Sequence, residues 1–152
     1  MEKNPFARGF RELIVYQKAR VAAKMVFDVT KSYPKEENYS LIDQSRRSSR
    51  SIGAQIDEAW AKRRYPNHFV SKLSDADGEQ NETQHWIETS VDCGYLNGSK
   101  AEEINAGLQE IGRMLQSMMI RAEAFQGSDH ARVREEAAVY GSIEEFFLNT
   151  EY

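Results

Sequence analysis

The sequence contains few of the residues that cross-link, interrupt or anchor a chain. One cysteine, Cys93, among 152 residues excludes an intrachain disulfide framework and a cysteine-based zinc cluster. That usage is typical of a reducing environment and predicts a cytoplasmic protein, with Cys93 as a small buried or half-buried side chain. No stretch approaches the length of a membrane span, and the N-terminal MEKNPFARGF lacks the apolar core of a signal peptide. We therefore expect no contact with a membrane.

Proline is also scarce, and its placement predicts long helices. Pro34 and Pro66, two of the three prolines, divide the chain into long uninterrupted segments, and no run of Val, Ile or Tyr alternates with turn residues as it would in a sheet. The predicted helices cover residues 12–32, 36–63, 67–94 and 99–126. Because short loops join them, we predict an all-α protein, an antiparallel up-and-down four-helix bundle.

Apolar or small residues recur at steps of three and four along each predicted helix, which defines the expected interior. The second helix has unusually small interior residues, and these permit close approach of a neighbouring helix. The expected interior positions are Leu13, Tyr16, Ala19, Ala23, Val26 and Val29 or Thr30; Leu41, Ser45, Ser48, Ile52, Ile56 and Ala59 or Trp60; Phe69, Leu73, Ala76, Thr83, Trp86 or Ile87, and Ser90 or Val91; and Ile104, Leu108, Ile111, Leu115, Met118 or Met119, Ala122 and Phe125.

The predicted helix ends have local signals. Asn67 is the expected N-cap of the third helix, and Gly94 suits a left-handed cap at its end. Ser99 and Glu102 have capping-box spacing at the start of the fourth helix. We expect residues 1–126 to form one bundle domain. Residues 127–152 form an acidic tail, which either adds a short fifth helix or remains outside the bundle.

The net charge of −4 argues against a protein that binds nucleic acid with its whole surface, but the charges are not evenly distributed. The segment between Gln44 and Arg64 contains six arginines and lysines and two acids, whereas the segment between Asn67 and Gly94 contains one lysine and six acids. A basic segment is therefore followed directly by an acidic one.

The acids of the third helix suggest a third alternative, a metal-dependent enzyme that would use Glu58, Glu82 and His85, but we favour neither a metal nor a catalytic interpretation. Glu82 and His85 form a Glu-x-x-His pair, but a di-iron bundle needs a second such pair, and neither His68 nor His130 has a glutamate three residues before it. A carboxylate pair of Glu58 and Glu82 would suit acid–base chemistry. No nucleophile or phosphate loop accompanies it, and buried acids are stable only when paired. We expect no catalytic residue, no metal and no cofactor, and each acid to pair with a nearby arginine.

Helical spacing predicts a polar layer between the second and third helices. Arg47, Ser51, Gln55 and Glu58 share one face of the second helix, and Glu79, Glu82 and Trp86 make a matching stripe on the third. We predict that they meet inside the bundle or at its contact with another subunit, where they fix register and partner geometry. Asp75, Asp77 and Glu88 are expected to face water.

These motifs resemble those of the four-helix bundle protein family related to 23S ribosomal RNA intervening-sequence proteins, over roughly residues 10 to 125. A distant relative is the accessory protein of diversity-generating retroelements. Gln55 stands where asparagine is usual, and Gly78 replaces a lysine. The matching residues are Gln44, Arg47, Ser51, Ile52, Gly53, Ala54, Glu58, Ala59, Lys62 and Arg63 on the second helix, and Lys72, Leu73, Ala76, Glu79, Glu82, Thr83 and Trp86 on the third.

The resemblance implies a closed bundle that assembles into a ring of five subunits and has no enzymatic activity. We therefore expect a self-assembling interaction or scaffold protein. For the retroelement relatives, the resemblance implies binding to nucleic acid and a reverse transcriptase through a basic surface. The alternative function is thus an accessory protein for RNA or DNA, because repeated cations grip phosphates. Its candidate contacts are Arg46, Arg50, Lys62, Arg63 and Arg64.

Overall fold

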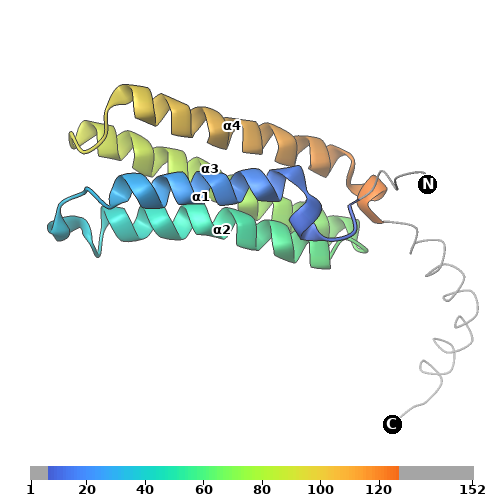
Figure 1. Cartoon of the computed structure of the whole chain (residues 1–152). Coiled ribbons are helices and arrows are strands. Elements are labelled where there is room, and N and C mark those ends of the chain that lie inside the picture. The colour runs from blue at the N-terminus through green and yellow to red at the C-terminus, as the bar shows by residue number, and fades with distance from the viewer. Residues whose placement is uncertain (1–6, 127–152) are drawn as a thin grey trace, which may run out of the picture.

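The computed structural model describes residues 7–126 and shows four α-helices and no strand in that range. The helices are α1 (Ile14–Thr30), α2 (Leu41–Ala61), α3 (Pro66–Asp92) and α4 (Gly98–Ile120), with three short 3-10 turns, η1 (Phe10–Glu12), η2 (Lys35–Glu37) and η3 (Ala122–Gln126). Successive helices run in opposite directions and pack side by side (Figure 1). The prediction of an all-α four-helix bundle is confirmed. The tail predicted at 127–152 lies outside the described residues.

The start of α2 differs from the sequence-based expectation at 36. Residues 35–37 form the 3-10 turn η2 instead, and α2 begins at Leu41. The Glu37 carboxylate accepts hydrogen bonds from the Leu41 N–H at 3.2 Å and from the Ser40 hydroxyl at 2.5 Å. It therefore satisfies an N–H group that the first turn of the helix leaves unpaired, although Glu37 lies before the helix itself.

The ends of α3 and α4 also correct the predicted caps. Pro66 occupies the first turn of α3, so Asn67 lies inside the helix; proline is favoured there because its missing N–H would be unpaired anyway. Asn97, rather than Ser99, caps α4 and accepts a hydrogen bond from the Lys100 N–H at 2.7 Å. The predicted end of the fourth helix at 126 is too late, because 122–126 forms η3.

The core is formed by the predicted interior faces. Fully buried side chains include Val26 from α1, Ile52 and Ile56 from α2, Leu73 from α3 and Leu108 from α4. Burying side chains of this size contributes about 1.5 to 3 kcal/mol each. The first helix is rotated slightly from the expectation, since Ala22 is buried whereas Tyr16 and Ala23 are only half-buried.

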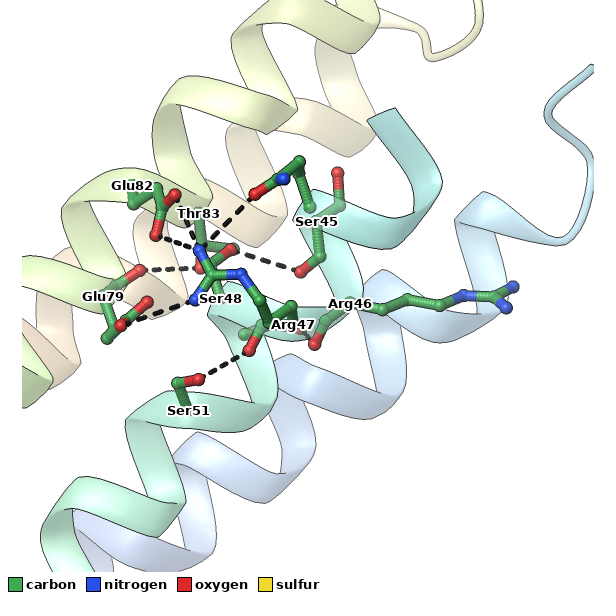
Figure 2. Close-up of polar contacts among 10 residues, drawn as sticks. Ser45, Arg46, Arg47, Ser48, Ser51, Glu79, Glu82 and Thr83 are labelled. Carbon is green, nitrogen blue, oxygen red and sulfur yellow. Dashed lines mark hydrogen bonds and ion pairs between the residues drawn. The ribbon is translucent and has the colours of Figure 1, made fainter. Parts of the chain in front are cut away.

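Small side chains bring α2 and α3 into close contact. Ser45, Ser48 and Ser49 are buried on α2, and the Thr83 hydroxyl lies 2.9 Å from the Ser48 hydroxyl across the interface (Figure 2). Ser45 and Ser49 donate to carbonyl groups of their own helix, so their burial leaves no unpaired hydroxyl. This close contact holds the outer edges of the two helices at a distance that side chains can bridge.

Cys93 corrects a further expectation. It is exposed, at the C-cap of α3 directly before Gly94, whose φ is 76°. Glycine adopts this left-handed conformation without steric cost, which is the cap predicted at that position.

Candidate functional site

The centre of the predicted polar layer lies on the outer rim where α2 meets α3 (Figure 2). The Arg47 Nη2 atom is 2.9 Å from both carboxylate oxygens of Glu82, and Arg47 Nη1 is 3.8 Å from Glu79. The side chains are 48%, 33% and 21% exposed for Arg47, Glu82 and Glu79. These polar residues therefore lie at the surface, partly exposed to solvent, and not inside the bundle. We call these residues, with Ser51, Gln55, Glu58 and Trp86, the α2–α3 seam.

Hydrogen bonds from α2 hold the Arg47 side chain and its turn in place. The guanidinium also approaches Gln44 Oε1 at 3.5 Å, and the Ser51 hydroxyl donates to the Arg47 carbonyl at 2.8 Å. Both contacts with Glu82 come from the single Nη2 atom, and the charges of the two partners make these hydrogen bonds stronger than neutral ones. Arg47 and Glu82 thus link α2 to α3 at their rim.

The pKa values of Glu79 and Glu82 are shifted in opposite directions. Burial raises the pKa of Glu79, as do the proximity and negative charge of the Glu82 carboxylate, and the more distant Arg47 does not offset these effects. Burial would also raise the pKa of Glu82, but the proximity of the Glu79 carboxyl and the hydrogen bonds and charge of Arg47 outweigh it and lower the pKa. Glu82 is therefore the member that keeps the negative charge.

Glu58 is held by a lysine of α3, which corrects the expectation that arginines pair with all these acids. The Lys72 Nζ atom is 2.9 Å from Glu58 Oε2 and 3.7 Å from Asp75. The hydrogen bond and charge of Lys72 hold the pKa of Glu58 below its usual value. Two ion pairs therefore connect α2 and α3. In one the cation, Arg47, belongs to α2, and in the other the cation, Lys72, belongs to α3.

Three polar atoms of the seam lack hydrogen bonds. They are Gln55 Oε1, Glu79 Oε2 and Trp86 Nε1, each covered by neighbouring atoms. The Trp86 indole lies close enough to Glu82 to help lower its pKa without meeting hydrogen-bond geometry. A buried polar atom without a partner costs about 1 to 3 kcal/mol, so part of this surface is left unsatisfied.

The candidate catalytic and metal residues are dispersed. Glu58 and Glu82 are bound to different cations rather than to each other, and the exposed His85 packs edge-on against Trp86 with ring centroids 4.7 Å apart. Within residues 7–126, no three His, Cys, Asp or Glu side chains gather closely enough to hold a metal ion.

The basic residues predicted for nucleic-acid contact fall into two groups. Arg46 points away from the seam, toward α1 (Figure 2), where its Nε donates to Thr30 at 2.9 Å. The guanidinium carbons of Arg46 and Arg50 lie 4.7 and 5.7 Å from the centre of the Phe27 ring. The sequence interpretation missed Arg20, which lines a groove with Arg50 between α1 and α2; flanked by Ala19 and Val21, it resembled an ordinary surface residue.

The second group, Lys62 to Arg64, follows the end of α2. Arg63 stacks on Trp60 at 4.4 Å and donates to its carbonyl, which stabilises the C-terminal end of the helix. Sixteen residues separate Lys62 from Arg46, or about 24 Å along the helix at 1.5 Å per residue. The predicted basic surface is therefore two separate clusters.

A polar network between α3 and α4 was also missed. Asp77, expected to face water, accepts hydrogen bonds from Gln80 and from Gln116, both at 2.9 Å. Gln80 is only 4% exposed and lies against Gly112, where a Cβ atom would come within 2.8 Å of its Nε2. The signal was available, because Gln80 completes the interior spacing between Ala76 and Thr83.

No helix in the described part of the chain is both long and apolar enough to cross a membrane. The acidic and basic side chains that line each helix interrupt every apolar stretch.

Comparison with known proteins places the chain in a family. No curated protein matches it. A crystal structure from Bacteroides thetaiotaomicron VPI-5482, described as a protein with unknown function from the S23 ribosomal protein family, is 28% identical. It superimposes with a TM-score of 0.62 and covers 70% of this chain and 98% of its own. The family model of the 23S rRNA-intervening sequence protein matches residues 11–117. The chain therefore belongs to the 23S rRNA-intervening sequence protein family, as its motifs predicted.

Proposed function

We propose that this protein is a non-enzymatic interaction module that assembles with copies of itself through the α2–α3 seam. The resemblance that predicted the fold also predicts five subunits in a closed ring. A ring requires a head-to-tail interface, in which a patch on one subunit meets a different patch on the next. We propose the α2–α3 seam as one of these two patches.

The observation that carries the proposal is the concentration of unsatisfied polar atoms. Among residues 7–126, buried side-chain atoms without a hydrogen bond occur in five residues, and three of these residues, Gln55, Glu79 and Trp86, belong to the seam. All three side chains are half-buried, so small rotations would present these atoms to a partner. A second subunit that supplies donors and acceptors would remove the cost of leaving them unpaired.

The composition of the seam supports the same proposal. Tryptophan and arginine dominate the energetic centres of protein interfaces, and the seam contains Trp86 and Arg47 at adjacent positions around Glu82. The pairing of Glu58 with Lys72 and of Glu82 with Arg47 leaves neither acid arranged as a general base. This pairing supports a non-enzymatic role.

Two matched substitutions test the proposal. Ser51 is half-buried in the seam, and Ala106 is exposed on α4; replacing either by arginine adds the same bulk and charge. We expect Ser51→Arg to lower the molar mass measured by light scattering while the circular dichroism spectrum stays helical. Ala106→Arg should leave the mass unchanged. Equal masses for the wild type and both variants would contradict a role of the seam in assembly.

A second candidate function is nucleic-acid binding by the face that α1 and α2 form. The observation that favours it is that Arg20, Arg46 and Arg50 make no ion pair with any described acid. Phosphate contacts by several such cations produce binding that weakens steeply with salt. The α3 and α4 helices together contain nine acids and three lysines or arginines and would repel the same ligand.

Electrophoretic retardation of an RNA oligonucleotide at low and high salt tests this candidate. Replacing Arg46 and Arg50 by serine should weaken the retardation. Replacing Lys62, Arg63 and Arg64 together should do the same if both clusters contact one strand. An unretarded oligonucleotide with the wild type at low salt would remove the candidate.

A further inference from the structure

A groove between α1 and α2 has the chemistry of a peptide site. Its cavity volume is about 290 Å³. Phe10, Tyr16, Ala19 and Gly53 are among its apolar lining residues, and Arg20 and Arg50 are its cations. Asp57 is the only acid in the lining. We call this feature the α1–α2 groove.

The two arginines of the groove are available for a ligand. Both are exposed, and within the described residues neither forms an ion pair or a hydrogen bond. The guanidinium carbon of Arg50 lies 5.7 Å from the centre of the Phe27 ring. Arg47, three residues before Arg50 on α2, is by contrast fully engaged by Glu82. An apolar floor between two unpaired guanidinium groups fits a segment with both carboxylates and aromatic rings, because arginine pairs with the former and stacks on the latter.

The chain itself contains such a segment. Residues 135–152 include five acids and no lysine, arginine or histidine. Within them, Glu144 and Glu145 are followed directly by Phe146 and Phe147. We propose that residues 143–148 dock into the α1–α2 groove of their own chain, with the carboxylates on Arg20 and Arg50 and the phenyl rings on the apolar floor.

The geometry of the bundle allows this contact. The described part of the chain ends at Gln126, whose side chain donates to the Arg64 carbonyl at 3.4 Å and so lies beside the C-terminal end of α2. Eighteen residues then lead to Glu144, a reach of up to about 60 Å at 3.3 to 3.6 Å per residue. The whole of α2 is only about 32 Å long. A tethered segment has an effective concentration in the millimolar range, so a weak site is enough.

Charge selects this groove over the other faces of the bundle. The α1 and α2 helices together contain six lysines or arginines and four acids, a net charge of +2, whereas α3 and α4 have a net charge of −6. An acidic segment is repelled by the second pair of helices and attracted to the first. The proposal does not depend on the subunit number, because neither Arg20 nor Arg50 belongs to the α2–α3 seam.

Limited proteolysis of the full chain tests the proposal. Chymotrypsin cuts after phenylalanine, and the rate of cleavage after Phe146 and Phe147 can be followed by mass spectrometry. In the wild type we expect slow cleavage that does not depend on protein concentration. Glu144→Lys with Glu145→Lys should accelerate it about tenfold, a ratio equivalent to about 1.4 kcal/mol. Glu135→Lys with Glu136→Lys changes the charge equally outside the docking segment and should leave the rate unchanged.

A charge exchange assigns the contact to the groove. Arg20→Glu with Arg50→Glu should also accelerate cleavage, and combining it with the two lysine substitutions should restore protection. Wild-type cleavage as fast as that of the isolated peptide 141–152 would overturn the proposal, as would a combined variant that is cut as fast as either pair alone. Protection that increases with protein concentration would indicate docking onto a second copy and would overturn docking within one chain.

Discussion

Replacing Gly112 by alanine should destabilise the bundle, although alanine is the better helix former. Gly112 is buried on α4, and a Cβ atom there would lie 2.8 Å from Gln80 Nε2 and 3.3 Å from Asp77 Oδ1. Gln80 has little room to move, because it donates to Asp77 at 2.9 Å and accepts from Gln84 at 2.6 Å. The substitution therefore forces this buried amide out of its hydrogen bonds.

The magnitude follows from opposing contributions. Alanine gains about 1 kcal/mol over glycine in a helix interior. Loss of two hydrogen bonds of about 1 kcal/mol each, with the further cost of about 1 to 3 kcal/mol for an unpaired buried amide, exceeds this gain. We expect a net loss of about 2 to 4 kcal/mol in the free energy of unfolding. Gly107, on the same helix, has nothing within 4 Å of its added Cβ, so Gly107→Ala should gain about 0.5 to 1 kcal/mol.

Urea unfolding followed by circular dichroism measures both changes. The slope of the free energy against urea should be the same in both variants, so that the midpoint reports stability. In a Gln80→Ala background the clash is absent, and Gly112→Ala should then become stabilising. A Gly112→Ala variant as stable as Gly107→Ala in the wild-type background would refute the argument from packing at Gln80.

Three further outcomes follow from the contacts. The pKa of Glu79 is raised in the folded protein, so ionisation of this side chain opposes folding at neutral pH. Glu79→Gln should therefore raise the melting temperature at pH 7. This gain should vanish as the pH falls toward 4.5, the ordinary pKa of glutamate. Glu82 has a lowered pKa, so Glu82→Gln should cost about 1 kcal/mol at pH 7 and progressively less as the pH falls below 4.5; equal pH profiles for the two variants would contradict the assignment of charge. Leu73→Ala should cost about 2 to 5 kcal/mol in urea unfolding, because Leu73 is fully buried, and a loss below 1 kcal/mol would contradict its place in the core. Cys93 should react fully with a thiol reagent in the native protein, since it is exposed, and a thiol that reacts only after unfolding would be inconsistent with its position at the C-cap.

The helices were predictable because their interior faces depend on local periodicity alone. Ile52, Leu73 and Leu108 recur with their neighbours at helical steps, and burial of a continuous stripe is the only arrangement that removes them from water. The arginine–glutamate contact of the seam followed from the same spacing, applied to two adjacent helices.

The errors arose where one side chain's position depends on another segment. Glu37 caps α2 from the preceding turn, so the start of the helix could not be read from the helix itself. Gln80 is buried because Gly112, thirty-two residues later, leaves space for its amide. Lys72 of α3 pairs with Glu58 of the neighbouring α2. The order of charges along each helix does not specify which pairs form between helices.

Self-assembly through the α2–α3 seam is the central claim, and the molar mass of the wild-type protein tests it most directly. Light scattering coupled to size exclusion should be measured at low and at high salt. We predict a mass near five times the chain mass of 17.5 kDa, unchanged by salt because the seam combines Trp86 and hydrogen bonds with its ion pairs. A mass of 17.5 kDa under both conditions would contradict the claim.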